Sequence, residues 1–313
     1  MTINDIAGRI YTLKVNTMKL NFSPFLLLVF ILNSCNSQKE LIKEGQELKR
    51  ISNEFEFTEG PASDAEGNVY FTDQPNNRIH KWSVGDGSVS VFMEEAGRAN
   101  GLYFDDDGNL LTAADENSEI WKINPEKEVE VLVESYQGNR LNGPNDLWIA
   151  SDGGFYFTDP YYQRDYWERT KKEIEEERVY YVNPQGEISI VVDDLVQPNG
   201  IIGTPDGKTL YIADIGDNKT YSYKINPDGS LSDKKLFTEL GSDGMTIDNQ
   251  GNLYLTGNGV TVFDKSGKKI QHIPIDKDWT ANVTFGGKDN QTLFITAQQA
   301  AYTLEMNVKG VRW

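Results

Sequence analysis

Six side chains that end in a carbonyl or carboxylate oxygen each stand eight residues ahead of a recurring turn. The turn carries Asp or Asn before a glycine and is followed by an apolar strand, as in EGNVYFTD and QGNLYLTG. The six side chains are Glu59, Asn100, Asn145, Asn199, Asp243 and Asn282, and the turns are centred on Gly67, Gly108, Gly153, Gly207, Gly251 and Asn290. A radial array of repeats explains this register, because it brings equivalent positions together at one axis. The pattern therefore indicates both a fold and a site.

Carboxylate and amide oxygens are the ligands that a hard cation such as Ca²⁺ takes, usually about six to eight including water. Two carboxylates in the set would roughly neutralise a doubly charged ion. Any one Asn or Asp here has a plainer explanation, because both residues hydrogen-bond their own backbone in turns. Six in register are harder to explain as turns, because a buried polar array is costly unless its members find partners. We therefore expect a divalent metal, most readily Ca²⁺, with Mg²⁺, Mn²⁺ and Zn²⁺ as alternatives.

The repeats extend over most of the chain. The glycines of successive turns lie 41, 45, 54 and 44 residues apart, and Asn290 follows 39 residues later. A period of about 40 to 45 residues with short β-branched and aromatic strands is typical of a propeller with about four strands per blade. We predict an all-β fold, a six-bladed β-propeller over residues 49–313. Residues 50–57 are expected to form a strand that completes the last blade and leaves no open edge.

The longest interval holds a charged and aromatic stretch at residues 161–178, YYQRDYWERTKKEIEEER. One interpretation is a solvated helical insertion. The other is a lid over the mouth of the central channel that uses Tyr161, Tyr162 and Tyr166.

The composition excludes several kinds of partner and site. The chain of 313 residues has a formal net charge of −18, which argues against a nucleic-acid partner, since such a partner needs clustered Lys and Arg. It contains two histidines and one cysteine. An intrachain disulfide is therefore impossible, and a zinc site built from several Cys or His ligands is not expected. A Ser-His-Asp triad would have to use His80 or His272, and neither lies in a nucleophile motif.

The N-terminal residues are expected to be a targeting segment. Residues 22–32 form an apolar run that is too short for a membrane span of about 20 residues and fits the core of a signal peptide. The run ends in Leu-Asn-Ser-Cys, which resembles a bacterial lipobox with Cys35 as the lipidated residue. An ordinary signal peptide with an incidental cysteine is the alternative. We thus expect a signal peptide over 1–34, with a true start possible at Met18, a polar tether over 35–48, and a lipid-anchored protein of the bacterial cell envelope.

The local sequences around the six positions resemble the gluconolactonase/regucalcin (senescence marker protein) family of six-bladed propellers. The resemblance covers residues 50–313 and more remotely extends to the diisopropylfluorophosphatase and paraoxonase propellers. It rests on the motifs FTEGP at 57–61, RLNGPNDL at 140–147, YFTDP at 156–160, QPNG at 197–200 and SDGM at 242–245.

The resemblance implies a metal held by Glu59, Asn145, Asn199 and Asp243, with Asp243 doubling as the acid/base group. It also implies that Arg140 and Asn142 contact substrate hydroxyls. Asn145 belongs to this substrate-binding set as well, and Asn100 and Asn282 are expected to touch substrate or water. The strand-end residues Asp73, Asp159 and Asp214 are expected to be structural.

The predicted function is metal-dependent hydrolysis of a sugar-acid lactone or similar small ester by a monomer. In this mechanism the metal polarises the carbonyl and Asp243 moves the proton of an attacking water. Three alternatives stay open. The fold could host a phosphotriesterase-type hydrolase in which the Asp attacks directly, a non-catalytic binding propeller at the cell surface, or a structural Ca²⁺ in the channel.

Overall fold

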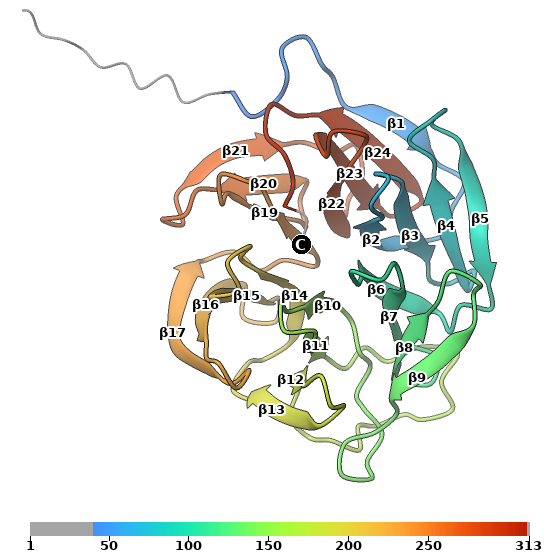
Figure 1. The fold of residues 1–313 in the computed structure, drawn as a ribbon, viewed down its shortest axis with the longest axis vertical. Helices are drawn as coiled ribbons and strands as arrows, with labels where there is room; N and C mark the ends of the chain where they lie inside the picture. The colour runs from blue at the N-terminus through green and yellow to red at the C-terminus, as the bar shows by residue number, and fades with distance from the viewer. Residues whose placement is uncertain (1–39, 312–313) are drawn as a thin grey trace, which may run out of the picture. The chain divides into compact units, whose positions relative to one another are not determined.

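The computed structural model describes residues 40–311, and the predicted signal peptide and Cys35 lie outside them. The described residues form six four-stranded antiparallel sheets arranged as blades around one axis (Figure 1). This confirms the predicted six-bladed propeller. Within residues 40–311 there is no helix, and hence none that could cross a membrane.

The blades follow one another along the chain, each beginning with its innermost strand. The first two contain β2 (Thr58–Ser63), β3 (Val69–Asp73), β4 (Arg78–Trp82), β5 (Val89–Glu94), and β6 (Ala99–Phe104), β7 (Leu110–Ala114), β8 (Glu119–Ile123), β9 (Val129–Val133). The next two contain β10 (Leu147–Ile149), β11 (Phe155–Asp159), β12 (Arg178–Val182), β13 (Ile188–Val192), and β14 (Pro198–Gly203), β15 (Thr209–Asp214), β16 (Lys219–Ile225), β17 (Leu231–Thr238). The last two contain β18 (Met245–Ile247), β19 (Leu253–Leu255), β20 (Val260–Phe263), β21 (Lys269–Ile273), and β22 (Asn282–Gly286), β23 (Thr292–Ala297), β24 (Ala300–Glu305), β1 (Lys49–Ser52).

The second strand of each blade is buried on both faces, because a neighbouring blade packs against either side. β3, β7, β11, β19 and β23 are buried along their whole length. These strands accordingly read as continuous apolar or small-residue runs, without the alternation of a half-exposed sheet. The outermost strands β5, β9 and β17 carry exposed positions and alternate more freely.

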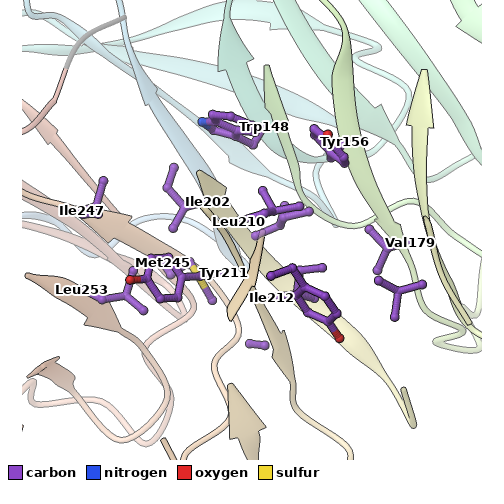
Figure 2. Close-up of a cluster of buried hydrophobic side chains, with 14 of the residues drawn as sticks. Trp148, Tyr156, Val179, Ile202, Leu210, Tyr211, Ile212, Met245, Ile247 and Leu253 are labelled. Carbon is purple, nitrogen blue, oxygen red and sulfur yellow. The ribbon is translucent and has the colours of Figure 1, made fainter. Parts of the chain in front are cut away.

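One hydrophobic cluster shows how adjacent blades are joined. Trp148 of β10, Tyr156 of β11 and Leu210 of β15 are fully buried together, and Met245 and Leu253 bring in the fifth blade (Figure 2). Burying aromatic and branched side chains between sheets supplies most of the free energy that holds the blades together. The blades therefore have little freedom to move apart, and the positions at their inner ends are fixed by this packing.

An N-terminal strand closes the ring, as predicted. β1 pairs antiparallel with β24, with Lys49 opposite Thr303 and Arg50 opposite Tyr302. The strand is shorter than expected, since it ends at Ser52 and residues 53–57 continue outside any ladder. Pairing the first strand with the last removes the free edge that an open array would present.

Residues 40–48, which the sequence predicted to be part of a polar tether, pack against the last blade. Leu41 is buried, Ile42 forms a β-bridge with Met306, and Lys43 N donates to the Glu305 carbonyl at 3.0 Å. The three apolar residues of this stretch were too few to reveal packing among its charged neighbours. Residues 40–48 thus pack on the propeller, and its first strand, β1, begins at Lys49.

The segment between β11 and β12, residues 160–177, is called the strap below. Its conformation is a series of turns and bends, so the interpretation as a helix is wrong. Trp167 and Ile174 of the strap are nevertheless buried. The strap is thus a packed part of the fold, and its side chains have defined positions.

The innermost strands of neighbouring blades approach each other closely, and a glycine substitution tests how rigid this packing is. Gly60 has φ +38° and a Cβ there would lie 2.0 Å from the Asn100 carbonyl oxygen, whereas Gly153 has φ +87° and open space around it. Gly153→Ala should cost about 1 kcal/mol of unfolding free energy from backbone strain alone. Gly60→Ala should cost about 3 kcal/mol or more, because the backbones of two blades must also separate. Urea unfolding of the two variants measures the difference. Equal losses would show that the inner strands tolerate displacement.

Candidate functional site

The structure brings the six predicted residues together at the axis. Each lies on an innermost strand or within two residues of its start, and all six are buried; they are Glu59, Asn100, Asn145, Asn199, Asp243 and Asn282. Glu59 is 4 % exposed and Asp243 is 9 % exposed, which is unusual for ionisable side chains without a cationic partner. The register that was read from the sequence therefore identified one buried polar site.

Contacts within the ring run across the first, fourth, fifth and sixth blades. Asn282 Nδ2 donates to Glu59 Oε2 at 3.4 Å, and Gly60 N donates to the same oxygen at 3.0 Å. Glu59 and Asp243 are close enough for each to affect the ionisation of the other, and Asn199 hydrogen-bonds Asp243. The two carboxyl groups thus share one polar centre that is lined by amides.

Both carboxyl groups resist ionisation. Burial, followed by the charge of Asp243, raises the pKa of Glu59 well above its ordinary value of 4.5. Burial raises the pKa of Asp243 to about 6, and hydrogen bonds from Trp279, Asn199 and Glu59 oppose the rise. Two negative charges in one buried place repel each other, and desolvation penalises each of them. A cation between them would relieve both penalties.

Asp243 is fixed by an indole, and its neighbour Asn199 is tied to the strap. Trp279 Nε1 donates to Asp243 Oδ2 at 2.6 Å from the loop between β21 and β22. Asn199 Nδ2 donates to the Tyr162 hydroxyl of the strap at 2.9 Å. The indole therefore holds one carboxylate oxygen of Asp243 in a defined position.

Strand-end aspartates position three of the ring residues. Asp73 Oδ1 accepts the backbone N–H of Phe57, Asp159 Oδ1 accepts that of Gly143, and Asp214 Oδ1 accepts that of Gln197. Each acceptor lies at the end of a second strand and fixes the chain two residues ahead of a ring side chain. This is the structural role expected for the three residues, and it explains why the same Asp recurs in three blades.

The donor set fits a hard cation. No group of three or more His, Cys, Asp or Glu side chains that could hold a metal occurs among residues 40–311, so amide oxygens have to complete any metal site there. The side-chain amide oxygens (Oδ1) of Asn100 and Asn199 are buried and have no hydrogen-bond partner. A buried acceptor without a donor is costly. Asn199 belongs to the expected metal ligands and Asn100 to the expected substrate contacts. An amide oxygen beside two carboxylates is the kind of ligand that suits Ca²⁺ or Mg²⁺.

The two residues that the family resemblance assigned to substrate contact lie elsewhere. Arg140 is exposed and its backbone N–H donates to Glu173 of the strap at 2.9 Å. Asn142 is fully buried, and its Nδ2 donates to the Glu176 carbonyl at 3.0 Å. Neither makes a described contact with a ring residue. The structure therefore brings the six-residue ring together but leaves this pair outside it.

Several residues at the site were missed in the sequence. Trp279 and Arg164 have no counterpart in the repeat pattern, and only the structure reveals where they lie. Asp146 had a weak signal, since it follows the ring residue Asn145 directly. Its Oδ1 accepts Leu147 N at 2.9 Å and its Oδ2 accepts Ile201 N at 3.3 Å, so it links two inner strands. Burial raises its pKa to about 7.

Comparison with known proteins gives a consistent result. The model of the SMP-30/Gluconolactonase/LRE-like region matches residues 57–299. The chain is 29% identical to a gluconolactonase of Zymomonas mobilis over 277 residues, which cover 79% of this chain and 78% of the relative. It is 26% identical to a 6-deoxy-6-sulfogluconolactonase of Pseudomonas putida, with 74% and 79% covered.

Solved structures show the same similarity. A gluconolactonase of Xanthomonas campestris superposes with a TM-score of 0.78 at 29% identity and covers 85% of this chain and 94% of its own. The calcium-binding protein regucalcin of Agrobacterium tumefaciens superposes with a TM-score of 0.71 at 20% identity, with 85% and 96% covered, and shares the fold.

Repulsion between the two ring carboxyls predicts that the unfolding free energy of the metal-free protein, measured in the presence of a chelator, depends on pH. A raised carboxyl pKa stabilises the folded state at low pH, and this contribution is lost as pH rises from 4.5 through the raised value. Glu59→Gln removes the charge and keeps an acceptor oxygen. The variant should therefore gain unfolding free energy relative to the wild type between about pH 5 and about pH 9.

Urea unfolding at both pH values measures this difference. The matched control is Glu54→Gln, since Glu54 is exposed and lies five residues away in the chain. A Glu59→Gln effect that is the same at both pH values would contradict the buried repulsion.

Proposed function

The chain belongs to the SMP-30/gluconolactonase/LRE-like family, and from this membership and the ring we propose that it is a lactonase that opens a sugar-acid lactone with a divalent cation. The observation that carries the proposal is the pairing of two buried carboxylates with orphaned amide oxygens at the axis of this family's fold. Gluconolactonase relatives that cover most of the chain support the reaction class.

Glu59, Asn145, Asn199 and Asp243 would hold the cation, and Ca²⁺ suits these oxygen donors. When bound, such an ion polarises an ester carbonyl and stabilises the negative charge that develops on its oxygen. Glu59 supplies a carboxylate oxygen and half of the compensating charge. Asn100 and Asn282 complete the ring and face substrate or water in this proposal.

Asp243 is the proton carrier. With Oδ2 held by Trp279, its Oδ1 accepts a proton as a water oxygen bonds to the lactone carbonyl carbon. When the ring C–O bond breaks, the proton passes from Asp243 to the departing alkoxide oxygen. The net reaction adds one water across the ester bond and yields a hydroxy acid.

We also propose that the enzyme is a monomer carried on the bacterial cell envelope by a lipid on Cys35. The support is the sequence alone, since an apolar run of signal-peptide length ends at the one cysteine of the chain. Cys35 lies outside the described residues.

The mechanism predicts a large kinetic effect at one residue. Asp243→Asn should lower kcat on glucono-δ-lactone by about 10²- to 10⁴-fold, because general-base assistance is lost. Acid release above the spontaneous rate measures turnover, and chelation of the wild type should abolish it. Asp217→Asn, which changes an exposed aspartate, should leave turnover unchanged.

Full activity of Asp243→Asn, or of the wild type in chelator, would refute the mechanism. A folded, metal-loaded protein with no turnover on a panel of lactones would favour a binding propeller. Transfer of solvent ¹⁸O into the Asp243 carboxylate during turnover would indicate direct attack, as in the phosphotriesterase alternative.

The anchor predicts a change of location. Cys35→Ser should move the protein from the membrane fraction to the soluble fraction of the cell, since the acyl chains that hold it are lost. Immunoblots of the two fractions measure this, with Asn36→Ser as the control. A wild type that is already soluble would refute the anchor.

A further inference from the structure

One aspartate departs from the capping pattern that three other blades share. Asp115 directly follows β7, at the place where Asp73, Asp159 and Asp214 end their strands. It caps no backbone amide of its own blade among the described hydrogen bonds. Its Oδ2 instead accepts Arg164 Nε at 2.9 Å and the Tyr166 hydroxyl, both from the strap. A carboxylate that is 2 % exposed thus holds the strap from the second blade.

The strap is tied down at several further points. Trp167 Nε1 donates to the Asp115 carbonyl at 3.0 Å. Arg169 donates to the Leu141 carbonyl and to Ser118 Oγ, each at 2.8 Å. Arg98 stacks on the Tyr166 ring at 4.3 Å. Arg98 and Arg169 thus fix the strap through these contacts. A third arginine keeps N–H donors that no described hydrogen bond uses.

Arg164 is that arginine. Its described hydrogen bond uses Nε alone, so its two terminal nitrogens have no described partner, and its side chain is 24 % exposed. A guanidinium has five N–H donors, and the hydrogen bond to Asp115 uses one of them, so four remain on the two terminal nitrogens. These donors are pre-organised, because the ion pair with Asp115 fixes the plane of the group.

The same guanidinium lies close to the ring. Arg164 lies 5.4 Å from the ring centre of Tyr162, whose hydroxyl bonds Asn199. Its charge lowers the pKa of Asp243, and Glu59 in turn raises the pKa of Arg164. Arg164 is therefore within electrostatic reach of both ring carboxyls, whereas Arg140 has no described contact with the ring.

We propose that Arg164, oriented by Asp115, is the substrate-selecting residue, and that its terminal nitrogens donate to neighbouring hydroxyls of an uncharged polyhydroxylated lactone. This assignment rests on the proposed lactonase function. The fork of a guanidinium matches two adjacent oxygen acceptors. Asp115 already balances the charge of Arg164, so an uncharged hydroxyl pair suits this position better than an anionic substituent does.

The test compares two lactones. Arg164→Ala and Arg164→Lys should lower kcat/KM on glucono-δ-lactone by about 10- to 100-fold, because the paired hydrogen bonds are lost. On δ-valerolactone, which has no ring hydroxyls, the change should stay within about 2-fold. Arg164→Lys keeps a cation beside Asp115 and guards against a folding defect. Arg78→Ala, which breaks an exposed ion pair between Arg78 of β4 and Glu94 of β5, is the matched control.

A separate kinetic measurement tests the role of Asp115. Asp115→Asn should raise KM for glucono-δ-lactone and leave kcat nearly unchanged, because it loosens Arg164 without touching the reacting atoms. Arg140→Ala should reduce kcat/KM less than Arg164→Ala does.

Three results would overturn the assignment alone: equal losses on both lactones in Arg164→Lys, a larger loss in Arg140→Ala, or a wild-type preference for 6-phosphogluconolactone. A wild type that hydrolyses neither lactone would refute the lactonase function and the assignment with it.

Discussion

The rest of the site depends on two carboxyl groups that are buried side by side. Glu59 and Asp243 come from the first and fifth blades and meet at the axis with little exposure. Neither has a basic side chain as a direct hydrogen-bond partner among the described contacts. The charge of such a pair has to be neutralised by protons or by a cation. The surrounding amides, with two unpartnered carbonyl oxygens, favour a cation.

The propeller makes this arrangement possible. Hydrophobic contacts between blades supply the stability that offsets a polar centre, and the β1–β24 pairing closes the ring around it. Strand-end aspartates then fix the approach of individual ring residues. The repeat is used differently in the second blade, where Asp115 holds the strap and places Arg164 near the ring. The strand-end aspartate thus fixes backbone amides in three blades and orients an arginine near the site in another.

Much of this could be predicted from the sequence, because repetition itself carries the information. A constant spacing between Glu59 or Asn199 and its turn predicts a shared axis, since equivalent positions in a radial array coincide. The repeat pattern could not predict the conformation of the strap. Its charge pattern suits a helix, yet contacts of Trp167 and Arg169 with distant residues decide its path. For the same reason Arg140, which lies within a family motif, proved to be exposed, while Arg164 lies beside Tyr162 near the ring.

The central claim is that the ring binds one divalent cation between Glu59 and Asp243. Isothermal titration of chelator-treated protein with Ca²⁺ tests it most directly. The account predicts one ion per chain, release of protons near pH 6 as the carboxyls ionise, and loss of binding in the Glu59→Gln, Asp243→Asn double variant. Absence of binding at millimolar Ca²⁺, or unchanged binding by the double variant, would contradict it.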